Sequence, residues 1–204
     1  MTTDSISPFF ALLSHLPKID RWNKSKSIDT ECLSTHSLQV AMFTLVLAML
    51  EREFDSSFED CPYELSVAAM FHDVSEVIAE DVNGLYKKMS PRIAELTKEL
   101  EQEACTILLD SLPDVLKENF ESLIFQKDHI SKKGNALIKV ADDLSAFAKA
   151  KEELRCGNLD FKTSVNRLQR VLQIKSKDMK SVSFFLKIFM PAFDSPIDDM
   201  VHML

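Results

Sequence analysis

The segment VAAMFHDVSEVIAED, residues 67–81, carries three polar side chains in an otherwise apolar run: His72, Asp73 and Glu76. Because this run is longer than most strands, we expect a helix over about 63–79. On that helix His72 and Glu76 would lie one turn apart on the same face, with Asp73 beside them. An unpaired buried charge costs several kcal/mol, so these groups need a partner. The segment therefore predicts a bound divalent cation.

The rest of the chain also favours helices. Its 204 residues, 46% of them hydrophobic, suit one domain with a sizeable core. Only three glycines occur, which argues against a turn-rich β fold, and long apolar-periodic segments such as 34–54 predict an all-α fold. We see no repeat and no linker. We therefore expect a single domain over 1–204, with its core at about 8–191 and a less ordered tail beyond 193.

The charge and the apolar runs limit the class of partner. A net charge of −8 repels nucleic-acid backbones and anionic membranes, so we expect neither a nucleic-acid polymer nor a membrane as partner. The longest apolar run, 40–50, is shorter than the roughly 20 residues that span a bilayer. The N-terminus has no positive region before its apolar residues and does not resemble a signal peptide. These features predict a cytoplasmic protein.

Further candidate metal ligands lie on two other predicted helices. His36 lies in the first turn of the helix over 34–54, and Asp142 and Asp143 lie in an apolar helix that we expect to begin near Asn135. Two imidazoles with two carboxylates form a mixed nitrogen and oxygen set that suits Mn, Co, Fe, Ni, Zn or Mg. Helical phase alone does not decide between Asp142 and Asp143.

The order His…His-Asp…Asp resembles the HD-domain phosphohydrolase superfamily. The similarity is closer to the bacterial HD-domain 5′-deoxynucleotidases, and it covers nearly the whole chain. The matching stretches are Arg21-Trp22, Thr30-Glu31, His36 to Met42, His72-Asp73-x-Ser75-Glu76-Val77, Lys139-x-Ala141-Asp142, Glu152-Glu153-Leu154 with Gly157-Asn158, and Ile188-Phe189-x-Pro191-x-Phe193. The resemblance implies an HD-type helical bundle and a homodimer. It also implies one divalent cation (Co, Mn, Mg or Zn) and hydrolysis of deoxyribonucleoside 5′-monophosphates to deoxyribonucleosides and phosphate.

The resemblance also implies a set of metal ligands. By matching positions these are His36, His72, Asp73 and Asp142, with the Lys139-x-Ala141-Asp142 match selecting Asp142 over its neighbour.

It further implies roles for four residues near the metal. Glu76 matches the acid/base carboxylate, and Arg21 and Trp22 match residues that hold the phosphate and press on the sugar. Asp81 matches a carboxylate that contacts the substrate. The sequence departs from the family pattern at Thr35, where glutamate is usual, and after Asp81, where Val82-Asn83-Gly84 replaces a Pro-Thr-Pro-like turn.

We therefore predict a metal-dependent phosphomonoesterase, a 5′-deoxynucleotidase. Two alternatives stay open. One is another HD-domain phosphohydrolase acting on a different nucleotide, such as an alarmone hydrolase; that group usually has HDxxED, and here Val77 stands in place of the second carboxylate. The other is a degenerate HD module that only binds nucleotides, which the intact ligand set disfavours.

Overall fold

Three helices form the centre of the fold: α2 (Leu33–Phe54), α3 (Pro62–Met70) and α8 (Lys132–Arg155). The computed structural model describes residues 6–82, 84–125 and 130–202. Within these ranges the elements are helices, and one isolated antiparallel bridge joins Asp20 to Cys32. The all-α prediction is therefore confirmed.

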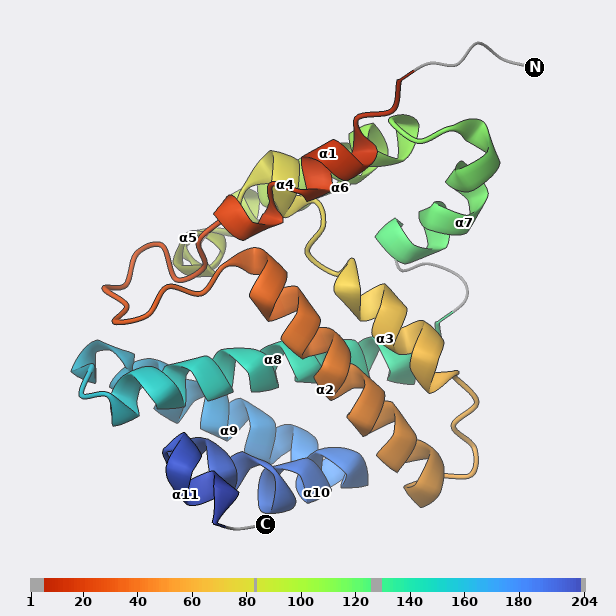
Figure 1. The fold of residues 1–204 in the computed structure, drawn as a ribbon. Coiled ribbons are helices and arrows are strands. Elements are labelled where there is room, and N and C mark those ends of the chain that lie inside the picture. Colours follow the sequence, from red (N-terminus) through yellow and green to blue (C-terminus); the bar gives the residue numbers. More distant parts are fainter. Residues whose placement is uncertain (1–5, 83, 126–129, 203–204) are drawn as a thin grey trace.

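The other helices lie on two sides of this centre (Figure 1). On one side are α1 (Phe9–Leu13), α4 (Glu76–Ala79), α5 (Gly84–Met89), α6 (Pro91–Asp110) and α7 (Asp114–Phe125). On the other are α9 (Lys162–Asp178), α10 (Lys180–Ile188) and α11 (Ile197–Val201). Short 3-10 turns cover Leu16–Lys18, Leu159–Phe161 and Met190–Asp194.

The helix ends follow familiar capping chemistry. The Ser90 hydroxyl accepts the Arg92 N–H at 3.2 Å, with Pro91 in the first turn of α6. Just after the C-terminal end of α8, Gly157 has φ +93°, a left-handed conformation that favours glycine. In the sequence, Ser90-Pro91 predicts a helix start and Gly157 predicts a helix end, and the structure confirms both boundaries.

The core consists of two apolar clusters. The larger joins α2, α3, α8, α9 and α10, and includes Ala69 and Ala141. The smaller joins α1, α6 and α7, and includes Val74. His72 and Asp73 therefore lie on the short segment that passes from one cluster to the other.

The predicted helix over 63–79 is wrong in its middle. Helix α3 ends at Met70, and the segment before α4 bonds three residues back, as in Glu76 N–H to Asp73 O at 3.0 Å. In a continuous α-helix the Ala69 carbonyl would accept the Asp73 N–H. Here the His72 Nδ1–H takes that carbonyl at 2.8 Å. His72 is thus presented by a turn and Glu76 by the first residue of α4, rather than both by one face of a single helix.

Two further expectations needed correction. Helix α8 begins at Lys132 rather than near Asn135, because Ser131 caps it by accepting the Gly134 N–H at 3.0 Å. The sequence predicts a break in the helical pattern over 80–90, with a turn signal at Asn83-Gly84, but residues Gly84–Met89 form the short helix α5. Asn83 itself lies outside the described residues.

By length and composition alone α2, which extends well past the apolar run at 40–50, could cross a bilayer. In the fold it packs against α3, α8 and α10, and it buries polar side chains such as His36, Thr44 and Glu51. This is the pattern of a core helix, and it brings His36 into the interior.

Candidate metal centre and nucleotide site

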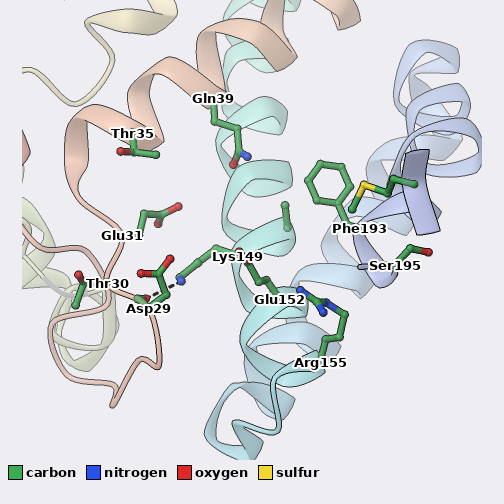
Figure 2. Close-up of a pocket in the computed structure, with 12 residues that line it drawn as sticks. Asp29, Thr30, Glu31, Thr35, Gln39, Lys149, Glu152, Arg155, Phe193 and Ser195 are labelled. Atoms are coloured by element: carbon green, nitrogen blue, oxygen red, sulfur yellow. Dashed lines mark hydrogen bonds between the residues drawn. The ribbon is translucent and has the colours of Figure 1, made fainter. Parts of the chain in front are cut away.

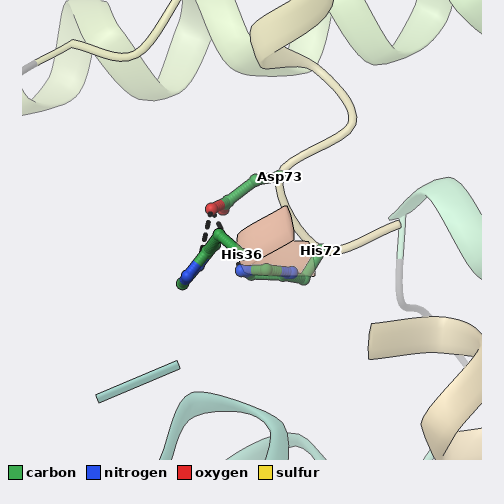
Figure 3. Close-up of side chains that lie close together, drawn as sticks. All are labelled: His36, His72 and Asp73. Atoms are coloured by element: carbon green, nitrogen blue, oxygen red, sulfur yellow. Dashed lines mark ion pairs between the residues drawn. The ribbon is translucent and has the colours of Figure 1, made fainter. Parts of the chain in front are cut away.

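Three side chains converge at the turn between α3 and α4 (Figure 3). His36 comes from the first turn of α2, and His72 and Asp73 come from the turn itself. One ligand atom from each lies within 4.8 Å of the others. The Asp73 Oδ2 atom lies 3.0 Å from His72 Nε2 and 3.7 Å from His36 Nε2. The structure therefore brings together three of the four predicted ligands as one cluster.

Hydrogen bonds on the far side of each ring fix the histidine tautomers. His72 Nδ1–H donates to the Ala69 carbonyl at 2.8 Å. His36 Nδ1 lies 3.0 Å from Ser145 Oγ, and the Ser145 hydroxyl donates to Gln39 Oε1 at 2.7 Å. Because the Ser145 proton is used on Gln39, its oxygen accepts from His36 Nδ1–H. Both rings thus present the Nε2 lone pair to the cluster, as metal-binding histidines do.

These two Nε2 atoms fit a metal. In the part of the chain that the structure describes, both are buried without a hydrogen-bond partner, although each lies near a carboxylate. An unsatisfied buried polar atom costs about 1–3 kcal/mol, so a ligand is the simplest explanation. Two imidazole lone pairs beside carboxylates form a donor set for a first-row divalent cation.

Asp142 lies beside the cluster on α8. Its Oδ1 is 3.3 Å from His36 Nε2, and its Oδ2 accepts a hydrogen bond from Lys139. Burial raises the pKa of Asp142, but contact with His36 and the Lys139 charge outweigh burial and hold that pKa below its usual range. Asp143, the other candidate, makes no ion pair with either histidine within the described ranges. The structure therefore places Asp142, not Asp143, next to the predicted ligands.

Arg21 reaches the same point from the loop before α2. Its Nη1 lies 3.3 Å from Asp73 Oδ2, its Nη2 lies 3.9 Å from Asp142 Oδ1, and its Nε donates to Glu31 Oε2 at 3.3 Å. Burial alone would lower the pKa of Arg21, yet these carboxylates raise it. A permanent positive charge thus adjoins two of the predicted ligands.

Trp22, the next residue in this loop, is held by a ring contact and a hydrogen bond. Its ring packs against Phe161 with 5.0 Å between centroids, and its Nε1–H donates to Glu31 Oε2 at 3.1 Å. Its φ of +58° lies in the left-handed region, which is uncommon for a bulky residue. Farther along the loop, Glu153 on α8 accepts the N–H groups of Ile28 and Asp29 at 2.8 and 3.0 Å.

Glu76 begins α4 and is buried, with 7% of its surface exposed. Its Oε2 has no hydrogen-bond partner in the described part of the chain. Burial, reinforced by the charges of Asp73 and Asp81, raises the pKa of Glu76 to about 9. The side chain therefore carries a proton at neutral pH in the metal-free protein. Asp81 is partly buried, its pKa is raised by burial, and its carbonyl accepts from Asn23 at 3.0 Å.

Sequence reasoning gave no role to several polar residues that support the site. Ser145 and Gln39 hold His36, and Lys139 holds Asp142. A signal was present, because Ser145 and Gln39 each lie three residues after a predicted ligand, on the same face of the same helix. Glu31 lies in the matching stretch Thr30-Glu31, but no role in the site was predicted for it.

A pocket of about 260 Å³ adjoins these supporting residues (Figure 2). Glu31, Gln39, Lys149, Arg155 and Phe193 are among the side chains that line it. Of the described residues around it, none is a predicted metal ligand. The pocket is thus next to the cluster and separate from it.

The chain is similar to curated 5′-deoxynucleotidases over almost its whole length. A 5′-deoxynucleotidase from Klebsiella pneumoniae is 36% identical over 197 residues, which cover 96% of this chain and 96% of that protein. A second 5′-deoxynucleotidase, from Photorhabdus laumondii, is 35% identical over 196 residues, covering 96% of this chain and 97% of its own length.

Solved structures give the same fold. An HD-domain phosphohydrolase from Listeria innocua superposes with a TM-score of 0.77 at 21% identity, covering 91% of this chain and 87% of that one. The predicted HD-type bundle is therefore confirmed. A family model described as 5′-deoxynucleotidase YfbR-like matches residues 8–193. With that match and relatives 35% identical over most of its length, the chain belongs to the YfbR-like 5′-deoxynucleotidase family.

Proposed function

We propose that this protein is a metal-dependent 5′-deoxynucleotidase that hydrolyses deoxyribonucleoside 5′-monophosphates to deoxyribonucleosides and phosphate. The observation that carries this proposal is the pair of buried, unpartnered Nε2 atoms of His36 and His72 beside the Asp73 carboxylate, in a member of this family. His36, His72, Asp73 and Asp142 would hold one divalent cation. When bound, such a cation lowers the pKa of water towards neutrality and neutralises phosphate charge.

Glu76 supplies the proton in this proposal. A general acid must be protonated at the working pH and must release its proton as the leaving group departs. Burial keeps the pKa of Glu76 high, at about 9, in the metal-free protein. Its protonated carboxyl would donate to the 5′-oxygen of the departing deoxyribonucleoside. Such catalysis contributes roughly 10²- to 10⁴-fold in rate.

Three further residues would bind the nucleotide. Arg21 offers its Nη atoms to phosphate oxygens, a pairing that guanidinium makes with two parallel hydrogen bonds. Trp22 would press on carbon 2′ of the sugar and exclude a 2′-hydroxyl by sterics. Asp81 would contact the nucleoside. Its backbone carbonyl accepts a hydrogen bond from Asn23, which lies in the loop that carries Arg21 and Trp22.

We also propose a cytoplasmic homodimer without a membrane partner. Two adjoining helices, α2 and α3, each expose a row of apolar side chains at helical spacing, which supports an interface between copies. The exposed residues are Leu38, Met42 and Met49 on α2 and Tyr63, Val67 and Met70 on α3. Light scattering should give twice the chain mass, and Val67→Glu should give the mass of one chain. A wild-type protein that is monomeric at micromolar concentration would contradict the dimer.

A phosphate-release screen tests the activity. Metal-stripped protein is supplied separately with Co, Mn, Mg or Zn and offered deoxyribo- and ribonucleoside 5′-monophosphates of each base. We expect release from the deoxyribonucleotides, and loss of both metal binding and release in Asp73→Ala. Equal release from ribonucleotides would refute the role given to Trp22. Absence of release with every metal and nucleotide would refute the function.

A further inference from the structure

We propose that Glu31 is a positioning residue that holds Arg21 and Trp22 as one unit, and that it thereby controls both phosphate binding and the choice of sugar. The kinetic part of this inference rests on the proposed function. The structural part does not, because it concerns only contacts among the three side chains.

A single oxygen atom carries both contacts. Glu31 Oε2 accepts the Arg21 Nε–H at 3.3 Å and the Trp22 Nε1–H at 3.1 Å. Only 8% of Glu31 is exposed, so water competes little for that oxygen. Hydrogen bonds to an ionised acceptor in such surroundings are stronger than neutral bonds at the surface. The two side chains therefore share one fixed point.

The backbone sets where that point lies. Arg21 N–H donates to the Glu31 carbonyl at 2.9 Å, and Leu33 N–H donates to the Ile19 carbonyl at 2.9 Å. The bridge between Asp20 and Cys32 lies between these two bonds. The two ends of the loop are thus paired, and Glu31 stands directly across from Arg21. This backbone pairing fixes the position of the Glu31 main chain independently of its side-chain bonds.

Trp22 depends on such contacts because its backbone is strained. A non-glycine residue in a sparsely populated conformation costs about 1–3 kcal/mol and persists only where its surroundings hold it. At φ +58° Trp22 is held by the packing on Phe161 and the bond to Glu31. Without Glu31 the ring packing on Phe161 and the bond from Ser25 N–H to the Trp22 carbonyl at 2.7 Å would remain, but the indole would lose the hydrogen bond that fixes its N–H edge.

Arg21 depends on Glu31 for its direction. With Nε fixed on Glu31, the opposite edge of the guanidinium points its Nη atoms at Asp73 and Asp142. That edge is the one a phosphate would need. A cation bound by the two aspartates would compete for their oxygens, but it would leave the Glu31 contact in place.

Fluorescence tests the structural part, since Trp22 is the only tryptophan in the chain. In Glu31→Ala we expect a red-shifted emission and a larger acrylamide quenching constant than in the wild type. Glu31→Gln, which keeps an acceptor of similar shape, should fall between the two. Asp29→Asn is the matched control, because it removes a carboxylate from the same loop two residues away. An unchanged spectrum and quenching constant in both Glu31 variants would overturn the proposal.

Kinetics test the consequence for the substrate. We expect Glu31→Ala to lower kcat/KM for a deoxyribonucleoside 5′-monophosphate at least about tenfold, the scale of one charge-assisted hydrogen bond. The ratio of deoxyribo- to ribonucleotide turnover should also fall. In a Trp22→Phe background, which lacks the indole N–H, Glu31→Ala should change that ratio no further. A ratio that is unchanged in Glu31→Ala, or that falls equally in both backgrounds, would overturn the role in sugar selection.

Two controls keep these outcomes distinct. If Glu31→Ala does not fold, Glu31→Gln carries the same comparisons, with melting temperature showing that the variant is intact. If the wild type releases phosphate from no nucleotide, the proposed function fails, and the fluorescence response of Trp22 still decides whether Glu31 positions it.

Discussion

The predicted metal ligands and the side chains in contact with them carry several formal charges. Three carboxylates (Asp73, Asp142 and Glu31) contact two cations (Arg21 and Lys139), which leaves a formal charge of about −1. A divalent cation would change that charge to about +1, which suits a phosphate monoester dianion. The negative charge of the free site favours binding of the metal cation first. The positive charge of the metal-bound site then favours binding of the phosphate anion.

The choice between two adjacent aspartates can be tested by a matched pair of variants. Asp142→Asn should lower affinity for the divalent cation at least about tenfold and reduce phosphate release, because Asp142 lies 3.3 Å from His36 Nε2. Asp143→Asn should leave both near the wild-type values. Calorimetric titration of metal-stripped protein measures the affinity. Equal losses in the two variants would contradict the assignment.

The raised pKa of Glu76 predicts a pH dependence of stability. Unfolding lowers that pKa from about 9 towards its ordinary 4.5, so between these pH values the folded metal-free protein holds a proton that the unfolded chain releases. Stability from this group is present below about 4.5 and is lost as the pH rises to about 9, by up to roughly 1.4 kcal/mol per unit. Urea unfolding of metal-free wild type and Glu76→Gln should show the variant gaining relative stability as the pH rises. A constant difference from pH 5 to 9 would show that the pKa of Glu76 is not raised.

At the scale of elements, the sequence was informative where local chemistry decides. Ser90-Pro91 and Gly157 marked helix ends because capping depends on a few adjacent residues. The break between α3 and α4 was missed, because it depends on a His72 side chain taking a backbone carbonyl within an apolar run. The pairing of residues 19–21 with 31–33, which places Glu31, left no periodic signal. Contacts between segments distant in sequence could be predicted only where the sequence resembles a known family, as for the metal ligands. The contacts of Glu31 were not predicted.

In the first turn of α8, we expect a glycine-to-alanine substitution to change stability in the direction opposite to the one that helix propensity predicts. Alanine is normally better than glycine in a helix by about 1 kcal/mol. At Gly134, however, an added Cβ would lie 2.6 Å from Asp60 Oδ2 and 2.9 Å from Leu65 Cδ2. Ser131 holds that Asp60 carboxylate, so it has little freedom to move. Overpacking costs about 1–3 kcal/mol, so Gly134→Ala should be destabilised by roughly 1 kcal/mol.

Gly84→Ala is the control for that measurement. It lies at the start of α5, where an added Cβ has nothing within 4 Å among the described atoms. Its urea midpoint should equal or exceed that of the wild type. A Gly134→Ala midpoint as high as that of Gly84→Ala would show that Asp60 and Leu65 adjust at little cost.

At the scale of the whole molecule, the site joins parts of the fold that otherwise pack separately. His36 belongs to α2, Asp142 to α8, and His72 and Asp73 to the segment between the two apolar clusters. Arg21 and Trp22 add the loop before α2, which Glu153 ties to the end of α8. A cation bound here would connect both clusters and the loop in the folded state.

This arrangement predicts that metal binding stabilises the entire chain. A ligand that binds only the folded state at 100 times its Kd adds about 2.7 kcal/mol, which for a domain of this size raises Tm by roughly 5–11 °C. Metal-stripped wild type should therefore gain Tm when Mn or Co is added, and a chelator should reverse the gain. Asp73→Ala should show no gain, because it lacks the carboxylate between the two Nε2 atoms, while Asp143→Asn should behave as the wild type. A similar gain in Asp73→Ala would mean that the stabilising cation binds elsewhere, since the unfolded chain offers no preformed site.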